Sequence, residues 1–319
     1  MPSNGSRISV FWVVAVLLLA GVTLATQWID NDFLFFAGYL VLTFVVLSTA
    51  WNILGGFTGY VNFGSAAFFA MGAYTSIVLY KWLELPMPLL IVAGGIISGL
   101  VGLGTGYLTL RLQGVFFAIA TLALAVVLET FITNWEYVGG SAGTYVIPPT
   151  EVFYFGSFVE ALFCLMLLLA VISVGVARYI NRSKIGRGLA AIRDDELAAE
   201  CMGVPTLRLK LISTTISGAL MGIAGAPYPF YVTYIDPLSA FNLTWAVNSI
   251  AMPLIGGTTT WFGPVLGALL LGIMQQWAQV TISSELNILL VGVMLVLFVV
   301  LAPQGLVGLA RQLLRRRRP

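Results

Sequence analysis

Long uninterrupted apolar runs, several of about 20 residues, restrict what this chain can fold into. The stretch Ile8–Thr26, for example, contains no charged residue. An α-helix needs about 20 apolar residues to cross the hydrocarbon layer of a membrane. Only 9% of the 319 residues are charged and 59% are hydrophobic, whereas about a quarter of the positions in soluble domains are charged. The sequence therefore predicts an all-α integral membrane protein, because its runs are too long and continuous for barrel strands.

Interruptions of these runs by charged residues, Pro or Gly clusters predict about ten transmembrane helices in a single transmembrane domain, residues 1–319. The predicted spans are Ile8–Thr26, Phe33–Leu54, Val61–Tyr80, Pro88–Leu110, Gly114–Thr133, Val159–Ile180, Leu207–Phe230, Trp245–Ile255, Phe262–Val280 and Leu286–Leu301. The eighth is short and precedes Gly256-Gly257, so it is either a tilted span or a broken helix beside a cavity. The first is expected to be a retained helix, since its apolar run is longer than that of a signal peptide.

The distribution of Lys and Arg predicts the orientation of these spans. With the N-terminus in the cytoplasm, Lys81 alone falls outside, and the rest of the 15 basic residues fall on the cytoplasmic side. Cytoplasmic loops of membrane proteins carry such an excess. Both termini are therefore expected in the cytoplasm, with the basic tail 304–319 beside anionic membrane lipid.

A charged island, residues 183–205, lies between the sixth and seventh spans and would then be cytoplasmic. Asp194 or Asp195 is expected to cap a short helix whose first turn holds Glu196. Gly203 and Pro205 would end that helix, on which an apolar stripe is expected at Leu197, Ala198, Cys201 and Met202. A second segment, Gly186 to Arg193, presents Leu189 and Ile192. An apolar stripe beside charges favours docking on a partner; an ordinary solvated loop is the alternative.

This island resembles the ATPase-docking loop of ABC importer permeases, in the form carried by the LivM-type branched-chain amino acid permeases. The general pattern, Glu-Ala-Ala, three residues, Gly, places Ala198, Ala199 and Gly203 on its small residues. Leu197 stands where that pattern has Glu, and Glu196 lies one position earlier. Under this resemblance, the docking residues in the cytoplasmic loop 181–206 are Gly186, Arg187, Leu189, Ile192, Arg193, Asp195, Glu196, Leu197, Ala198, Ala199, Met202 and Gly203.

Further segments are similar to the same permease family and extend the resemblance over residues 50–303. They are the Gly-rich stretch from Gly55 to Tyr74, Phe117 to Leu122, Asn134-Trp135 with Gly139 to Gly143, and Gly256-Gly257 with Phe262 to Ala268. The resemblance implies an importer subunit for branched-chain or other neutral amino acids in a bacterial inner membrane. It also implies a sister permease, two cytoplasmic ATPases that bind ATP and Mg, and an extracytoplasmic substrate-binding protein.

Two other functions stay open at this point. The same importer type carries urea or short amides, and a secondary transporter driven by an ion gradient is the alternative from another class. The spans offer few acidic residues for ion coupling, and Glu129 is the candidate among them. An enzyme is disfavoured because the chain has no His and no Cys pair, so catalytic and metal-binding residues, a cofactor bound by this chain and a nucleic-acid partner are not expected.

Polar residues inside the spans are the candidates for a substrate pathway, because burying them in a membrane is costly. They are Thr58, Asn62, Ser65, Tyr74, Glu129 and Asn248. Close helix packing through Gly64 and Gly72 is the alternative for the Gly-rich stretch, and an interfacial position is the alternative for Glu129. The outer loop 134–158 is either a plug over the spans or a contact for the binding protein.

Overall fold

The computed structural model describes residues 4–26, 28, 31–147, 156–281, 289, 292–293, 296–297 and 305–309. Its long helices are α1 (Asn4–Thr26), α2 (Asp32–Thr58), α3 (Ser65–Leu83), α4 (Met87–Thr109), α5 (Val115–Thr133), α6 (Phe158–Arg182), α9 (Thr206–Gly225), α12 (Leu243–Gly256) and α13 (Gly263–Thr281). Shorter elements connect them: η1 (Glu136–Val138), η2 (Gly140–Ala142), β1 (Thr144–Tyr145), α7 (Lys184–Asp194), α8 (Glu196–Cys201), α10 (Tyr228–Val232), β2 (Tyr234–Ile235) and α11 (Pro237–Ala240).

Seven helical segments within these described ranges are long and apolar enough to cross a membrane. They correspond to α2, α3, α4, α5, α6, α9 with α10, and α11 with α12. The prediction of a mainly helical, multi-pass membrane protein is therefore confirmed. The first predicted span appears as a shorter apolar helix within α1, Phe11–Thr26. Most of the predicted tenth span, Leu286–Leu301, lies outside the described residues.

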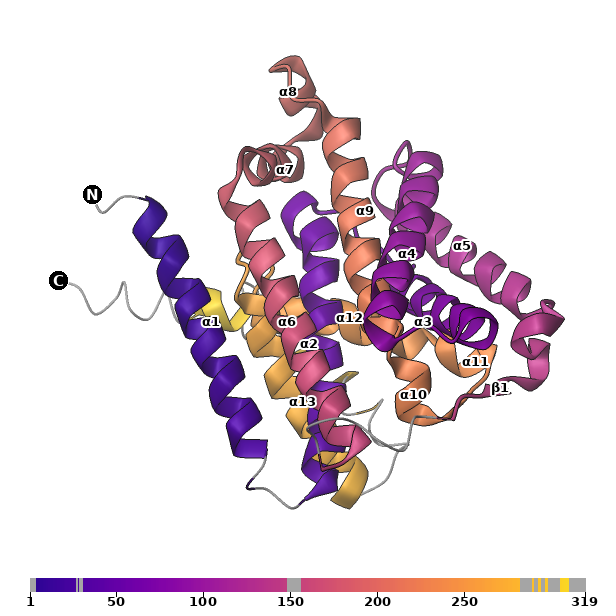
Figure 1. Ribbon diagram of the computed structural model, residues 1–319. Helices are drawn as coiled ribbons and strands as arrows, with labels where there is room; N and C mark the ends of the chain where they lie inside the picture. Colours follow the sequence, from indigo (N-terminus) through magenta and orange to yellow (C-terminus); the bar gives the residue numbers. More distant parts are fainter. Residues whose placement is uncertain are drawn as a thin grey trace.

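The second half of α2 forms the centre of the bundle. All residues from Thr43 to Thr58 are buried, and α2 packs against α6, α9, α12 and α13. At the edges of the molecule, α1 runs beside α6 and α5 leans away on the opposite side (Figure 1). Only 22% of the most apolar window of α5 is buried, less than in any other of these seven segments.

Glycines bring α4 and α9 into direct backbone contact. A Cβ atom at Gly222 would lie 2.5 Å from the carbonyl oxygen of Gly94, and one at Gly95 would lie 2.5 Å from Ile223 Cγ2. Small residues allow membrane helices to pack this closely, so that backbone atoms supply much of the contact. The same seam continues to α3, where a Cβ atom at Gly72 would lie 2.2 Å from the carbonyl oxygen of Gly222.

The seventh predicted span is a broken helix, whereas the eighth, Trp245–Ile255, lies within the continuous helix α12. Gly225 ends α9, and Pro227 precedes the short helix α10. The segment then forms β2, which pairs antiparallel with β1 of the outer loop through Thr144 opposite Ile235. The sequence analysis did not predict this two-stranded ladder, which attaches the loop 134–158 to the connection between α10 and α11.

Candidate functional site

The charged island forms two short helices, α7 and α8, which project beyond one end of the bundle (Figure 1). The side chain of Ser183 caps α7 by accepting a hydrogen bond from the Gly186 N–H at 3.3 Å. The carboxylate of Asp195 caps α8 by accepting from the Ala198 N–H at 3.0 Å. The predicted helix cap at Asp195 is therefore confirmed. Past α8 the chain turns at Gly203, whose φ of +82° is readily adopted only by glycine.

An apolar stripe of α8 and the residues after it faces outward. Leu197 is 69% exposed and Met202 is 84% exposed, and Ala198 and Cys201 are also exposed. Such side chains are rarely left in water when they lie next to one another. We define these four residues as the α8 stripe. They form a continuous exposed apolar surface on the island.

The other predicted docking residues divide between exposed and buried positions. Arg187, Arg193, Asp195 and Gly203 are exposed. Leu189, Ile192, Ala199 and Gly186 are buried. Leu189 and Ile192 belong to the core cluster of the bundle, so the expectation that α7 presents them outward is wrong: their apolar side chains anchor α7 to the spans.

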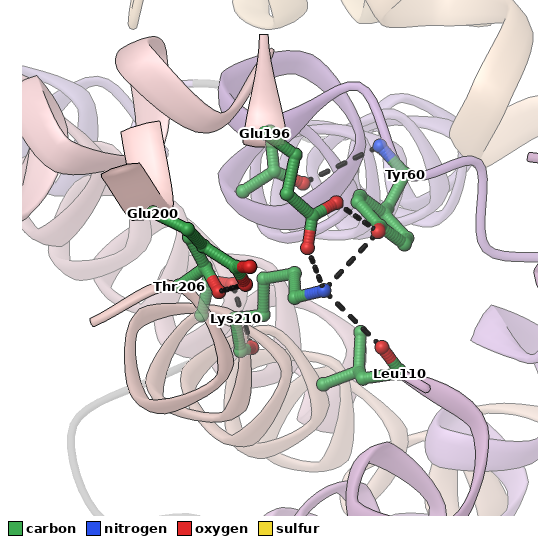
Figure 2. A network of polar contacts seen from close by, with 8 residues as sticks. Tyr60, Leu110, Glu196, Glu200, Thr206 and Lys210 are labelled. Carbon is green, nitrogen blue, oxygen red and sulfur yellow. Dashed lines mark hydrogen bonds and ion pairs between the residues drawn. The ribbon is translucent and has the colours of Figure 1, made fainter. Parts of the chain in front are cut away.

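A buried network of polar contacts joins α8 to three other parts of the molecule (Figure 2). Lys210, which is 3% exposed, donates from Nζ to Glu196 Oε1 at 2.5 Å, to Tyr60 Oη at 3.1 Å and to the carbonyl oxygen of Leu110 at 3.2 Å. The Tyr60 hydroxyl in turn donates to the second carboxylate oxygen of Glu196. An ammonium group has three protons to donate, so Lys210 is fully satisfied.

The network connects four separate parts of the chain. Glu196 lies in the first turn of α8 and Lys210 in α9, whereas Tyr60 lies in the loop between α2 and α3. Leu110 caps the end of α4. Any displacement of α8 must therefore move these elements or break a buried ion pair, which costs several kcal/mol when one charge is left unpaired.

A second polar contact fixes the far end of α8. Thr206, the first residue of α9, donates from its hydroxyl to Glu200 Oε1 at 2.5 Å. The surroundings also raise the pKa of Tyr60 above its ordinary value of 10.0, first through burial and then through its hydrogen bond to the Glu196 carboxylate. Tyr60 therefore keeps its proton and serves as a hydrogen-bond donor.

The sequence analysis missed the role of Lys210, which it grouped with the cytoplasmic loop residues. A signal was present, because Lys210 lies inside the predicted span Leu207–Phe230. A cation within an apolar helix requires a partner. Glu196 was singled out and Tyr60 lies within the Gly-rich stretch from Gly55 to Tyr74, but no spacing rule relates residues 60, 110, 196 and 210.

The predicted pathway residues are dispersed through the bundle. Ser65 and Ser249 contact each other through their hydroxyls at 2.8 Å, and the neighbouring Asn248 accepts a hydrogen bond from Gln275 Nε2 at 3.0 Å. Asn62 accepts from the Gly64 N–H at 2.7 Å through its side chain. Its hydrogen bond therefore supports the turn before α3.

The remaining pathway residues lie in different surroundings. Thr58 donates to the carbonyl oxygen of Leu54 at 2.5 Å, within α2. Tyr74 is buried, and its hydroxyl has no hydrogen-bond partner among the described residues. Glu129 is half-buried on the outlying helix α5. Within the described part of the chain, no group of three or more His, Cys, Asp or Glu residues could hold a metal ion.

Comparison with known proteins identifies relatives for nearly the whole bundle. Residues 33–299 match the family model described as "Branched-chain amino acid transport system / permease component". The chain is 28% identical over 301 residues to the high-affinity branched-chain amino acid transport system permease protein LivM of Salmonella typhimurium, covering 86% of this chain and 70% of that protein. The LivM protein of Escherichia coli strain K12 is similar to the same extent.

A more distant relative is the probable branched-chain amino acid transport permease protein LivH of Methanocaldococcus jannaschii. It is 24% identical over 276 residues, which cover 81% of this chain and 86% of the relative. No solved structure matches this chain. Since the family model covers most of the chain, the protein belongs to the family of permease components of branched-chain amino acid transport systems.

Proposed function

We propose that this chain is a transmembrane permease subunit of an ABC importer that moves branched-chain or other neutral amino acids into the cell. Family membership supports a transport role, and the printed names of the relatives support the substrate class. ATP hydrolysis would take place on partner subunits, which would bind ATP and Mg, and this chain would bind no cofactor. The orientation in this proposal places α7 and α8 in the cytoplasm of a bacterial cell, with about ten spans in the inner membrane and both termini inside.

The observation that carries this proposal is the α8 stripe held on a buried ion pair. Leu197 and Met202 offer apolar surface to a partner, while Lys210 and Glu196 tie the same helix to α9 and α4. A short helix that lays an apolar face into a groove is a common mode of protein recognition. Here it would fit a groove on a cytoplasmic ATPase, and closure of the two ATPases would move the spans through Lys210.

The other proposed partners follow from the importer architecture. A sister permease would complete the membrane part as a heterodimer, and an extracytoplasmic binding protein would deliver the substrate. The outer loop, tied to the bundle through the β1–β2 ladder, lies at the end of the molecule away from α8 (Figure 1). It is the surface that a binding protein would meet in the proposed orientation.

We place the substrate pathway near Tyr74. Its hydroxyl is buried without a partner among the described residues, so a bound amino acid could satisfy it without breaking an existing hydrogen bond. Ser65 and Asn248 already hydrogen-bond to side chains of the bundle. A role for Glu129 in receiving the ammonium group belongs to the same proposal.

Uptake by the reconstituted complex tests the proposal. Proteoliposomes would hold this chain with its sister permease and ATPases, and the binding protein and labelled leucine, alanine or urea would be added outside. Leu197→Glu should abolish co-purification of the ATPases and reduce uptake at least tenfold. Leu238→Glu is the matched control for co-purification, because Leu238 is 72% exposed on α11, away from α8 (Figure 1).

Several results would contradict the proposal. Full ATPase binding by Leu197→Glu would show that the α8 stripe is not part of the docking surface. Uptake that survives ATP depletion but collapses with an ionophore would indicate a secondary transporter. Uptake of urea alone would show that the amino acid assignment is wrong.

A further inference from the structure

A groove between α1 and α6 opens at the end of the bundle where α7 begins. Its volume is about 480 Å³. Phe11 and Trp12 of α1 line it on one side, and Ile172, Val176, Arg178 and Arg182 of α6 line it on the other. Neither the proposed docking surface nor the proposed substrate pathway uses these residues.

The charged residues among those described at the groove are both arginines. The guanidinium carbon of Arg178 lies 4.3 Å from the centre of the Phe11 ring and 5.2 Å from that of Trp261, so its cationic group is oriented by two aromatic faces. Arg182 follows one turn later on α6 and is exposed. No acidic residue is among the described residues that line the groove. Two neighbouring guanidinium groups provide planar donors suited to a phosphate.

The rest of the groove is apolar and continues along the helices. Ile172 and Val176 lie about three and two turns before Arg182 on α6 and form an apolar wall beside the arginines. Trp12 is half-exposed on the facing side. A Cβ atom at Gly175 would lie 2.8 Å from Trp12 Cη2, so glycine lets the two helices approach closely at this level. A free phosphate would use the arginines and leave the apolar wall uncovered.

We propose that this groove binds an anionic phospholipid, with its phosphate at Arg178 and Arg182 and an acyl chain against Ile172 and Val176. Basic pockets between membrane helices on the cytoplasmic side favour such lipids. The inference rests on the proposed orientation, which places this end of α6 at the cytoplasmic leaflet. Ser183, the residue after Arg182, caps α7, so the bound lipid would lie against the start of the docking segment.

Fluorescence quenching by brominated lipids tests the proposal on the full-length chain in a neutral detergent. Brominated phosphatidylglycerol should quench tryptophan emission at a concentration at least tenfold lower than brominated phosphatidylcholine. Trp12→Phe should remove much of this quenching, because Trp12 lines the groove. Native mass spectrometry of the same samples would count the bound lipids.

Variants with a matched control make the test specific. Each cationic side chain near an anionic lipid surface contributes about fivefold in affinity. Arg182→Gln should therefore weaken phosphatidylglycerol binding about fivefold, and Arg178→Gln with Arg182→Gln should weaken it roughly 20- to 30-fold. Arg111→Gln is the control, since Arg111 is also exposed and stacks over a ring, that of Tyr107, outside the groove. It should change the affinity less than twofold.

Three results would overturn the inference. An unchanged preference for phosphatidylglycerol in the double variant would show that the two arginines do not bind the lipid phosphate. An equal loss in Arg111→Gln would indicate general attraction between charges. Displacement of the lipid by millimolar inorganic phosphate would indicate a site for a soluble anion. Lipid binding by the isolated chain does not require transport, so any of these results would leave the proposed permease role to be decided by uptake.

Discussion

Lys210 of α9 and Glu196 of α8 form a largely buried ion pair, with 2.5 Å between Nζ and Oε1. Both charges are also hydrogen-bonded to Tyr60, whose hydroxyl lies between them. Burial of an ion pair is tolerated when neighbouring groups satisfy the remaining donors and acceptors. The first turn of α8 is therefore held against the spans by a fully paired polar centre.

Lys210→Met should loosen α8, because the Glu196 carboxylate would keep its partly buried position without a cation. Such a loss costs about 3 kcal/mol when one partner of a buried pair is removed. Faster trypsin cleavage after Arg193 would report the loosening. Lys184→Met, at an exposed lysine of α7, is the control. The double variant Lys210→Met with Glu196→Met should regain most of the protection, and no recovery would mean that the pair is not the main contact.

Tyr60→Phe should lower stability by about 1 kcal/mol near neutral pH, the usual contribution of one hydrogen bond. The pKa of Tyr60 in the folded protein is raised above its ordinary value of 10.0. Its contribution is therefore complete below pH 10 and is lost as the pH rises toward the folded-state pKa. The stability difference between the two proteins, measured by thermal unfolding in detergent, should shrink from pH 8 to about pH 11.

Tyr107→Phe is the control for this experiment, since Tyr107 is an exposed tyrosine near the end of α4. A stability difference between the native protein and Tyr60→Phe that stayed constant across this pH range would contradict the assigned environment of Tyr60.

Gly72→Ala should destabilise the bundle, because its Cβ atom would lie 2.2 Å from the carbonyl oxygen of Gly222 and backbone atoms would have to move. Overpacking of this kind typically costs 1–3 kcal/mol. Gly104→Ala is the matched control in α4, since nothing lies within 4 Å of the position of its Cβ atom. That variant should be neutral or gain up to about 1 kcal/mol from helix propensity. Equal melting temperatures of the two variants would exclude the close contact of α3 with α9.

Tyr74→Phe should leave the melting temperature unchanged or raise it, because the removed hydroxyl has no partner among the described residues. If Tyr74 meets the substrate, uptake should fall severalfold at the same time. Ser65→Ala provides the comparison, as it removes a hydroxyl that is paired with Ser249 at 2.8 Å and should cost about 1 kcal/mol of stability. Normal uptake by Tyr74→Phe would place the pathway elsewhere.

The apolar runs predicted α2 to α6 well, because the length of a membrane helix is set by the thickness of the hydrocarbon layer. Local chemistry also predicted the helix cap at Asp195. Burial within the charged island was not predicted, because Leu189 and Leu197 are the same residue type in similar local sequence. Only packing against the core distinguishes them. The contact of Lys210 with Tyr60 and Leu110 depends likewise on how distant elements meet.

The glycine seam described above has a mechanical consequence. Most helices pack through side chains, which can change rotamer when the helices shift. Gly222 and Gly94 instead leave α4 and α9 in backbone contact. A force applied at Lys210, near the start of α9, would therefore displace α9 and α4 together as one rigid body. Little of this movement would be absorbed between the helices, so even a small displacement at the α8 end would be transmitted nearly whole to the far end of the pair.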